Sequence, residues 1–171
     1  VLGWPGPVVA SIQGHALAGG ALLALCADAR VMASGGGRFG IHGVQLGVVY
    51  PQIAVEVLRW RIERGLAERV LYGGRIRPAH EALDSGLVDE LADPEALVER
   101  SRQYALARLA PAGLKSAVLR PVLDRLGGED EEDAERWLDH WFAPGTREKV
   151  AAARDALLTR NGGSRPGETE T

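Results

Sequence analysis

Residues 14–28 read GHALAGGALLALCAD, and they place two adjacent glycines where a strand is expected to pass into a helix. The preceding run, Pro7–Ile12, is short, apolar and rich in β-branched residues, which is typical of a buried strand. Gly19 and Gly20 then open a helix over residues 21–27 that is apolar on almost every side, so we expect this helix to be buried. The function of the stretch depends on what the two glycines face.

A second strand, Ala29–Ala33, follows that helix closely. A strand, a helix and a strand within about 30 residues match a right-handed crossover between parallel strands. We therefore expect an α/β protein with a parallel sheet near its N-terminal end. Farther along, the sequence predicts helices over 53–64, 67–71, 78–83, 94–110 and 146–159, a helix that starts at the acidic run 129–133, a strand over 87–91 and a disordered tail over 161–171.

The composition is that of an ordinary globular domain. The chain has 171 residues, of which 46% are hydrophobic and 25% charged, and its formal net charge is −3. This mild acidity argues against nucleic acid or an anionic membrane as a partner. The single cysteine, Cys26, excludes an internal disulfide, and no apolar run reaches the ~18–20 residues of a membrane span, so we expect a cytoplasmic protein. No set of His, Cys, Asp and Glu has metal-ligand spacing, and no metal is expected.

Two adjacent glycines at the start of a helix favour close approach of a ligand to the backbone. The first N–H groups of a helix are unpaired and carry a partial positive charge, and glycine presents no Cβ to an incoming group. A phosphate site is disfavoured, because the stretch lacks both common glycine-rich phosphate-binding spacings. One developing oxyanion is a better match, since one or two N–H donors suffice. The alternative is that Gly19 and Gly20 only permit close packing of the helix on the strand.

Three segments of the chain resemble the crotonase (enoyl-CoA hydratase/isomerase) superfamily. They are PVVASIQGHALAGGALLALCADARVMA (7–33), RFGIHGVQLGVVYP (38–51) and AERVLYGGRIRPAHEALDSGLVDEL (67–91), with a weaker match at TREKVAAARDAL (146–157). The resemblance implies a spiral of ββα turns over residues 1–91, in which this chain holds the C-terminal part, and helices over 92–160 that build trimers. It also implies an N-terminally truncated member that lacks the family's first oxyanion donor and much of its CoA site.

The resemblance assigns roles to individual residues. In this family the carbonyl of an acyl-CoA thioester lies between two backbone N–H groups, and the second donor corresponds to Gly19. CoA is then part of the substrate, and no separate cofactor is expected. The expected substrate-binding residues are Ala16, Leu17, Ala18, Gly20, Leu22, Gly43 and Leu46.

The sequence departs from the hydratase pattern at two positions. Hydratases of the family use two glutamates to activate water, and this chain has Leu22 and Gly43 in their places. Neither residue can transfer a proton, so we expect negligible hydration. An apolar residue at the first position resembles the branch that moves a double bond from β,γ to α,β, although that branch keeps the second glutamate. His42, next to the vacant position, is the nearest candidate base, and His15 and Glu56 are weaker candidates.

The leading hypothesis is an acyl-CoA-processing enzyme closest to the enoyl-CoA isomerases, with Gly19 and His42 as its catalytic residues. A rival enzyme hypothesis is another reaction of the family, such as hydration, decarboxylation or thioester hydrolysis. The rival outside enzymology is a non-catalytic acyl-CoA-binding protein or an inactive fragment. The expected assembly is a homotrimer or a dimer of trimers, with Trp137 and Trp141 as packing anchors.

Overall fold

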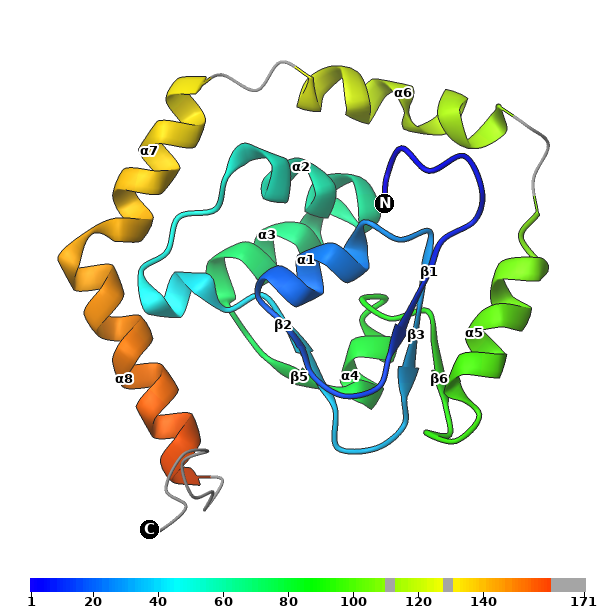
Figure 1. Ribbon diagram of the computed structural model, residues 1–171, viewed down its shortest axis with the longest axis horizontal. Coiled ribbons are helices and arrows are strands. Elements are labelled where there is room, and N and C mark those ends of the chain that lie inside the picture. The colour runs from blue at the N-terminus through cyan, green and yellow to red at the C-terminus, as the bar shows by residue number, and fades with distance from the viewer. Residues whose placement is uncertain (110–112, 128–130, 161–171) are drawn as a thin grey trace, which may run out of the picture.

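Two small sheets form the centre of the protein in a computed structural model that describes residues 1–109, 113–127 and 131–160 (Figure 1). The strands are β1 (Val9–Ile12), β2 (Ala16–Leu17), β3 (Ala29–Ala33), β4 (Arg38–Gly40), β5 (Arg77–Pro78) and β6 (Glu90–Ala92). One sheet has the order β1-β3-β6 and is parallel throughout. The other has the order β2-β4-β5, in which β2 and β4 are parallel and β5 is antiparallel to β4.

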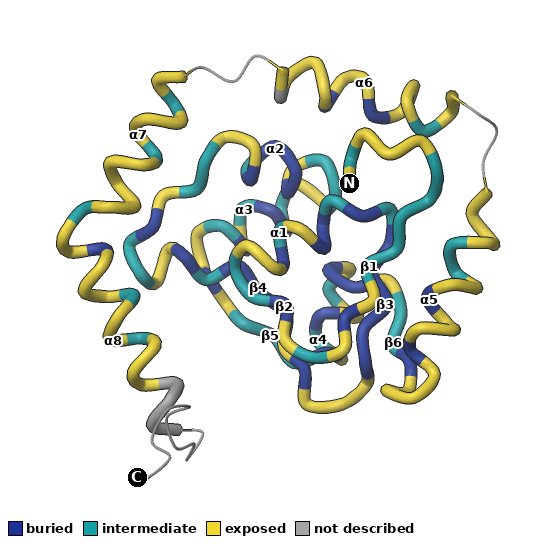
Figure 2. The backbone as a smooth tube through the Cα atoms, in the orientation of Figure 1, coloured by how far each residue is buried: buried dark blue, intermediate teal, exposed yellow. Residues whose placement is uncertain are grey.

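Helices connect and surround these sheets. They are α1 (Gly19–Leu25), a 3-10 turn η1 (Gly43–Leu46), α2 (Gln52–Arg61), α3 (Arg64–Gly73), α4 (Ala79–Asp84), α5 (Leu97–Leu106), α6 (Leu114–Leu126), α7 (Glu131–Phe142) and α8 (Pro144–Arg160). The core lies between the sheets and α1 to α4 (Figure 2), and its largest fully buried side chains include Phe39, Leu25 and Met32. Strand, second strand and helix repeat along the first half of the chain, which confirms the predicted α/β fold of ββα turns.

The first ββα turn positions the glycine pair. Strand β1 pairs in parallel with β3, with Val9 opposite Ala29, and α1 makes the connection back to β3. The predicted crossover between parallel strands is therefore correct, and β3 has the predicted bounds. Strand β2 was too short for its pattern to show in the sequence. Because β2 belongs to the second sheet, the chain changes sheets just before the glycines.

Some predictions for individual elements were wrong. Helix α5 begins at Leu97 rather than at Pro94, because the chain first makes a turn in which Ala96 N–H donates to Asp93 O at 3.0 Å. Helix α1 is not buried on all sides, since Leu23 is 62% exposed. Helix α6 has no counterpart in the sequence prediction, and it contains Pro121, which ordinarily argues against a helix interior. The predicted disordered tail, 161–171, lies outside the described residues.

The C-terminal helices run around the outside of the core. Helix α5 packs on β1 and β3, α6 packs on α2, and α7 and α8 form a pair that reaches η1 (Figure 1). Asp133 of α7 accepts a hydrogen bond from the backbone N–H of Gln52 at 3.1 Å, and His140 Nε2 lies 2.6 Å from Gly47 O. These contacts fix α7 against the segment between β4 and α2. The predicted boundary at residues 91 and 92 lies within β6, and the division into a spiral and an oligomerisation region stays a prediction.

Candidate active site

The turn into α1 is held by the neighbouring strand. Ala18, the N-cap residue, donates its backbone N–H to Gly40 O of β4 at 2.8 Å. Its φ of 49° and ψ of −117° lie in a region that L residues rarely adopt, and a residue with a Cβ stays there only when its surroundings hold it. Gly40 itself is confined, because a Cβ on it would lie 2.9 Å from Arg75 O. The backbone immediately before Gly19 is thus fixed by packing.

Gly19 and Gly20, in contrast, have open space in front of them. Both residues are exposed, and a Cβ added to either would meet no heavy atom of the described residues within 4 Å. Neither has a positive φ. Close packing of helix on strand therefore does not explain these glycines, and that alternative is wrong. As the first residues of α1, they have no carbonyl one turn back within the helix to bind their N–H groups.

The predicted substrate-binding residues lie near this turn. Ala16 and Leu17 form β2, opposite Phe39 and Gly40 of β4, and Ala18 caps α1. The remaining predicted residues sit on the next turn of α1 and on η1: Leu22, Gly43 and Leu46. Strand β2 leads into the glycine turn and pairs with β4, and η1 follows β4 in the chain. Leu22 and Leu46 are both half-buried and apolar, and their role as walls for an acyl chain stays a prediction.

Tyr50 occupies the space beside Gly43, and the sequence interpretation missed it. A Cβ on the buried Gly43 would lie 3.0 Å from the Tyr50 hydroxyl oxygen and 3.1 Å from its ring. The hydroxyl accepts a hydrogen bond from Val44 N–H at 3.1 Å. Burial raises the pKa of Tyr50, outweighing the opposite effect of the backbone N–H groups of Val44 and Gly43. Nothing in the local sequence pattern shows that the chain folds back from Tyr50 onto Gly43.

The candidate bases have different surroundings. His42 is half-buried, its Nδ1 has no partner in the described part of the chain, and burial lowers its pKa, so its imidazole is neutral at pH 7. His15 Nδ1 accepts a hydrogen bond from the backbone N–H of Arg38 at 3.1 Å. This bond holds the loop before β2 against the start of β4. Glu56 is buried and paired with Arg125 at 2.9 Å. Of these three side chains, His42 has a buried ring nitrogen without a partner among the described residues.

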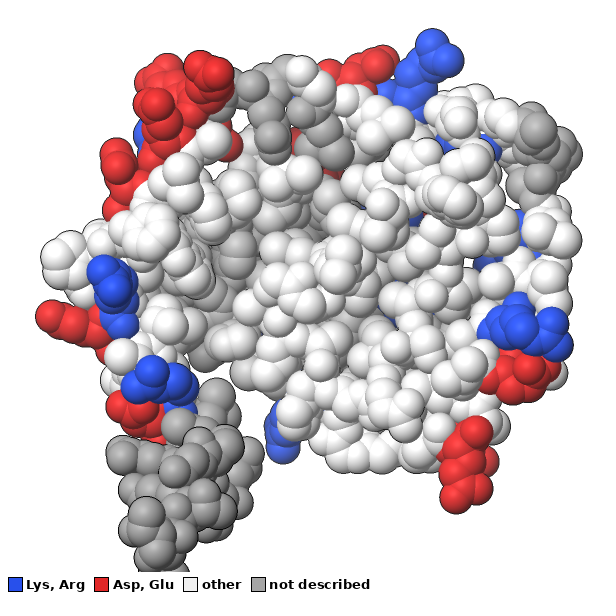
Figure 3. All heavy atoms as spheres, viewed as in Figure 1, with Lys and Arg blue, Asp and Glu red and all other residues white. Residues whose placement is uncertain are grey.

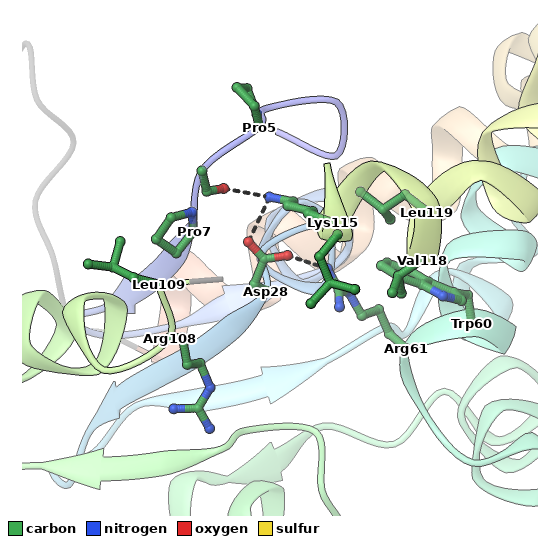
Figure 4. A pocket seen from close by; sticks show the side chains of 12 residues that line it. Pro5, Pro7, Asp28, Trp60, Arg61, Arg108, Leu109, Lys115, Val118 and Leu119 are labelled. Atoms are coloured by element: carbon green, nitrogen blue, oxygen red, sulfur yellow. Dashed lines mark hydrogen bonds and ion pairs between the residues drawn. The ribbon is translucent and has the colours of Figure 1, made fainter. Parts of the chain in front are cut away.

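A cavity lies beside Asp28, just beyond the C-terminal end of α1 (Figure 4). It has a volume of about 350 Å³ and mostly apolar walls, including Pro7, Trp60 and Leu119. Three of its charged side chains, Asp28, Arg61 and Lys115, are engaged with one another just after α1, and the fourth, Arg108, lies over the Tyr104 ring. A thioester carbonyl at Gly19 would not reach them, because the length of α1 separates the two places.

Asp28 is the centre of that charged group. Its Oδ2 accepts from Lys115 Nζ at 2.7 Å and from Val8 N–H at 2.8 Å, and its Oδ1 lies 3.4 Å from Arg61 Nη2. Burial alone would raise the pKa of Asp28, but the hydrogen bonds from Lys115 and Val8 and the two positive charges lower it below its usual value. These bonds connect the C-terminal end of α1 to α2, α6 and the N-terminal segment. We regard them as structural.

The described residues were also searched for a metal-binding group and for a membrane-spanning helix. Among the described residues, no three His, Cys, Asp or Glu side chains are grouped to hold a metal ion, and no helix is both long and apolar enough to cross a bilayer. Cys26 is half-buried, and burial raises the pKa of its thiol, so the protonated form dominates at neutral pH. Both properties favour a packing role for Cys26 over a nucleophilic one.

Comparison with known proteins agrees with the fold. A family model described as enoyl-CoA hydratase/isomerase matches residues 1–132. The chain is 32% identical over 121 residues to (E)-benzylidenesuccinyl-CoA hydratase of Thauera aromatica, covering 70% of this chain and 47% of that protein. It is 36% identical over 135 residues to a putative enoyl-CoA hydratase of Thermus thermophilus, covering 78% of this chain and 52% of that protein.

Solved structures give the same result. The human mitochondrial delta3-delta2-enoyl-CoA isomerase superposes with a TM-score of 0.80 at 25% identity, covering 90% of this chain and 62% of that chain. A probable enoyl-CoA hydratase of Mycobacterium tuberculosis superposes with a TM-score of 0.64 at 28% identity, covering 94% and 61%. The chain spans about half the length of the curated relatives described above. The predicted crotonase resemblance is confirmed, and the chain belongs to the enoyl-CoA hydratase/isomerase family.

Proposed function

We propose that this chain binds an acyl-CoA thioester at the N-terminus of α1 and stabilises its enolate through the Gly19 N–H. The observation that carries the proposal is the open space in front of Gly19 and Gly20, on a backbone that Ala18 and Gly40 hold in place. A preorganised N–H donor stabilises an oxyanion without reorganisation, and it acts on the charge that develops at the thioester oxygen. Substrates of this kind are named for the relatives in the family.

Of the family's reactions, hydration is the least compatible with this site. By resemblance to the hydratases, Leu22 and Gly43 stand at the positions of the two catalytic glutamates. No pair of carboxylates is therefore available at these positions to activate water. The isomerase hypothesis needs one base, and the unpartnered Nδ1 of His42 is the group available for it. The second candidate function is binding of acyl-CoA without catalysis. The absence of carboxylates at Leu22 and Gly43 favours binding without catalysis, and the positioned Gly19 amide favours catalysis.

Replacing Gly19 with alanine tests the proposal on the chain itself. The new Cβ would enter the space in which the thioester is proposed to lie, so crotonyl-CoA should bind at least about tenfold more weakly, a loss of ~1.4 kcal/mol. The free energy of unfolding should rise by about 0.5–1 kcal/mol, because alanine replaces glycine in a helix without meeting another atom. Isothermal titration calorimetry and urea unfolding measure the two effects.

Gly36→Ala is the matched control. Gly36 is exposed, and a Cβ on it meets no described atom within 4 Å, but it lies in the turn between β3 and β4. Binding by this variant should equal that of the parent. Equal binding of crotonyl-CoA by the parent and by Gly19→Ala would show that the ligand does not bind at the glycine turn. A parent that binds no acyl-CoA would contradict the proposed function as a whole.

A further inference from the structure

The cavity beside Asp28 combines an apolar lining with a group of charged side chains. It forms where the N-terminal segment, the end of α2, the residues after α5 and the start of α6 meet. In Figure 4, Val118 and Leu119 of α6 lie on one side of Asp28, and Pro7 and Leu109 lie on the other. The volume of about 350 Å³ falls in the range of small-molecule sites. The lining therefore suits the apolar part of a small ligand.

The charges in and next to this cavity do not balance. The side chains of Arg61 and Lys115 are 13% and 14% exposed, and both pair with Asp28. The neighbouring Arg30 pairs with Asp89, and two of its nitrogens, Nε and Nη1, have no hydrogen-bond partner among the described residues. Burial lowers the pKa of Arg61, Asp28 raises it, and the charge of Arg30 lowers it again. Three cations thus share two carboxylates, which leaves one positive charge in excess.

Both cations beside Asp28 keep hydrogen-bond donors that no described residue uses. Lys115 Nζ donates to Asp28 Oδ2 at 2.7 Å and to Gly6 O at 2.9 Å, which leaves one of its three protons. Arg61 donates through Nε to Leu25 O at 2.9 Å and through Nη2 to Asp28 Oδ1 at 3.4 Å. Its Nη1 makes no hydrogen bond within the described part of the chain. An incoming acceptor therefore finds a donor on each cation.

We propose that this cavity binds a small organic monocarboxylate, with its carboxylate beside Arg61 and Lys115 and its apolar part against α6. A half-buried cation without a full counter-charge is costly, so an anion that pairs with it adds to the energy of apolar contact. An excess of one charge matches a carboxylate better than a phosphate group, which carries nearly two charges at neutral pH. The apolar part would cover Leu114 and Val118, which are 51% and 57% exposed. The inference goes beyond the proposed function, because Asp28 follows the end of α1 and the thioester is placed at its start.

Sodium octanoate and octanamide test the inference by isothermal titration calorimetry on the parent chain. Octanoate should bind saturably, and octanamide, which has the same hydrocarbon chain but no charge, should bind at least about tenfold more weakly. A saturating concentration of crotonyl-CoA should leave octanoate binding unchanged, because the two sites are separate. Equal binding of octanoate and octanamide would show that the cations do not recognise the ligand. Displacement of octanoate by crotonyl-CoA would place it in the proposed acyl site, and either result overturns the inference.

Two substitutions in the charged group should change octanoate binding in opposite directions. Lys115→Met removes the excess cation and should weaken binding roughly 10–100-fold. Asp28→Asn removes the carboxylate that both cations share, so octanoate should bind this variant more tightly than the parent. Octanoate should then raise the thermal unfolding midpoint of Asp28→Asn by more than it raises that of the parent. Weaker binding by both variants would contradict the role of the excess charge.

Val118→Trp tests the cavity without changing a charge. The indole would fill part of the cavity from the exposed side of α6, so octanoate should bind at least about tenfold more weakly, with crotonyl-CoA binding unchanged. Val98→Trp is the matched control, since Val98 is 70% exposed on α5 and does not line the cavity. Its octanoate binding should equal that of the parent. If Val118→Trp also binds octanoate as the parent does, the ligand lies elsewhere and the inference is wrong.

Discussion

At the scale of single residues, Ala18 and Gly19 at the start of α1 each differ from the residue type that their backbone conformation favours. Ala18 has a Cβ in a backbone conformation suited to glycine, whereas Gly19 has no Cβ in a conformation open to any residue. Such an arrangement is unfavourable for folding at both positions, and residues of this kind cluster at functional sites. The sequence predicted the role of Gly19 through its family resemblance. It could not predict the strain at Ala18, which depends on the bond to Gly40 O.

Replacing Ala18 with glycine should relieve that strain. The strained conformation costs about 1–3 kcal/mol, and glycine loses about 0.4–1 kcal/mol through the entropy of the unfolded chain, so we expect a net gain near 1 kcal/mol in urea unfolding. Acyl-CoA binding should weaken, because the Gly19 N–H is then less firmly oriented. Ala96→Gly is the control: Ala96 caps α5 with a φ of −92°, and glycine there should only destabilise. An equal decrease in the free energy of unfolding for Ala18→Gly and Ala96→Gly would mean that Ala18 is not strained.

At the scale of secondary-structure elements, predictability depended on the clarity of the pattern as well as on its length, since the 13-residue α6 with its internal Pro121 has no counterpart in the sequence prediction. Strand β3 and helix α2 are long enough for burial to shape their composition, and both were found near their predicted positions. Strands β2 and β5 have two residues each, too few for any periodicity. The contact of Tyr50 with Gly43 was also hidden, because it depends on how η1 turns the chain back and not on either residue's neighbours in sequence.

The group around Asp28 shows how one element is fixed to others, and it gives a pH-dependent prediction. The folded pKa of Asp28 lies below its unfolded value of about 3.9, so its contribution to stability is present above pH 4 and is lost as the pH falls through the folded pKa. Lys115→Met removes one cation, and the pKa of the still half-buried Asp28 should rise. We expect a loss of about 1–3 kcal/mol at pH 7 and acid unfolding that begins at a higher pH.

Circular dichroism during acid titration measures both effects. Arg102→Met is the matched control, since Arg102 pairs with Glu99 on the exposed face of α5 and its loss should change neither the stability nor the acid midpoint. Arg61 stays beside Asp28 in the Lys115 variant, so the carboxylate is not left without a cation. An unchanged acid midpoint for Lys115→Met would show that Asp28 draws its stabilisation from Arg61 and the backbone alone.

At the scale of the whole molecule, the distribution of charge indicates a face for association. Figure 3 shows Lys, Arg, Asp and Glu gathered mainly at the periphery, while the middle of this view shows almost none of them. Leu23 of α1 is 62% exposed, and on α7 Phe142 is 61% and Leu138 44% exposed. Exposed apolar side chains that gather into a patch favour contact with another polypeptide. The sequence predicts an oligomer through its family resemblance, but composition does not indicate which face associates.

We expect the chain to form a homotrimer or a dimer of trimers, with α7 in the contact between copies. Trp137 and Trp141 stack on each other with ring centroids 5.8 Å apart, which stiffens the exposed apolar side of α7. Phe142→Glu should place an unpaired charge in the contact and lower the mass measured by light scattering at micromolar concentration. Val98→Glu, which changes a residue on α5 that is 70% exposed, should leave the mass unchanged. A monomeric parent would refute the predicted assembly, and dissociation by both variants would show that the contact is not specific to α7.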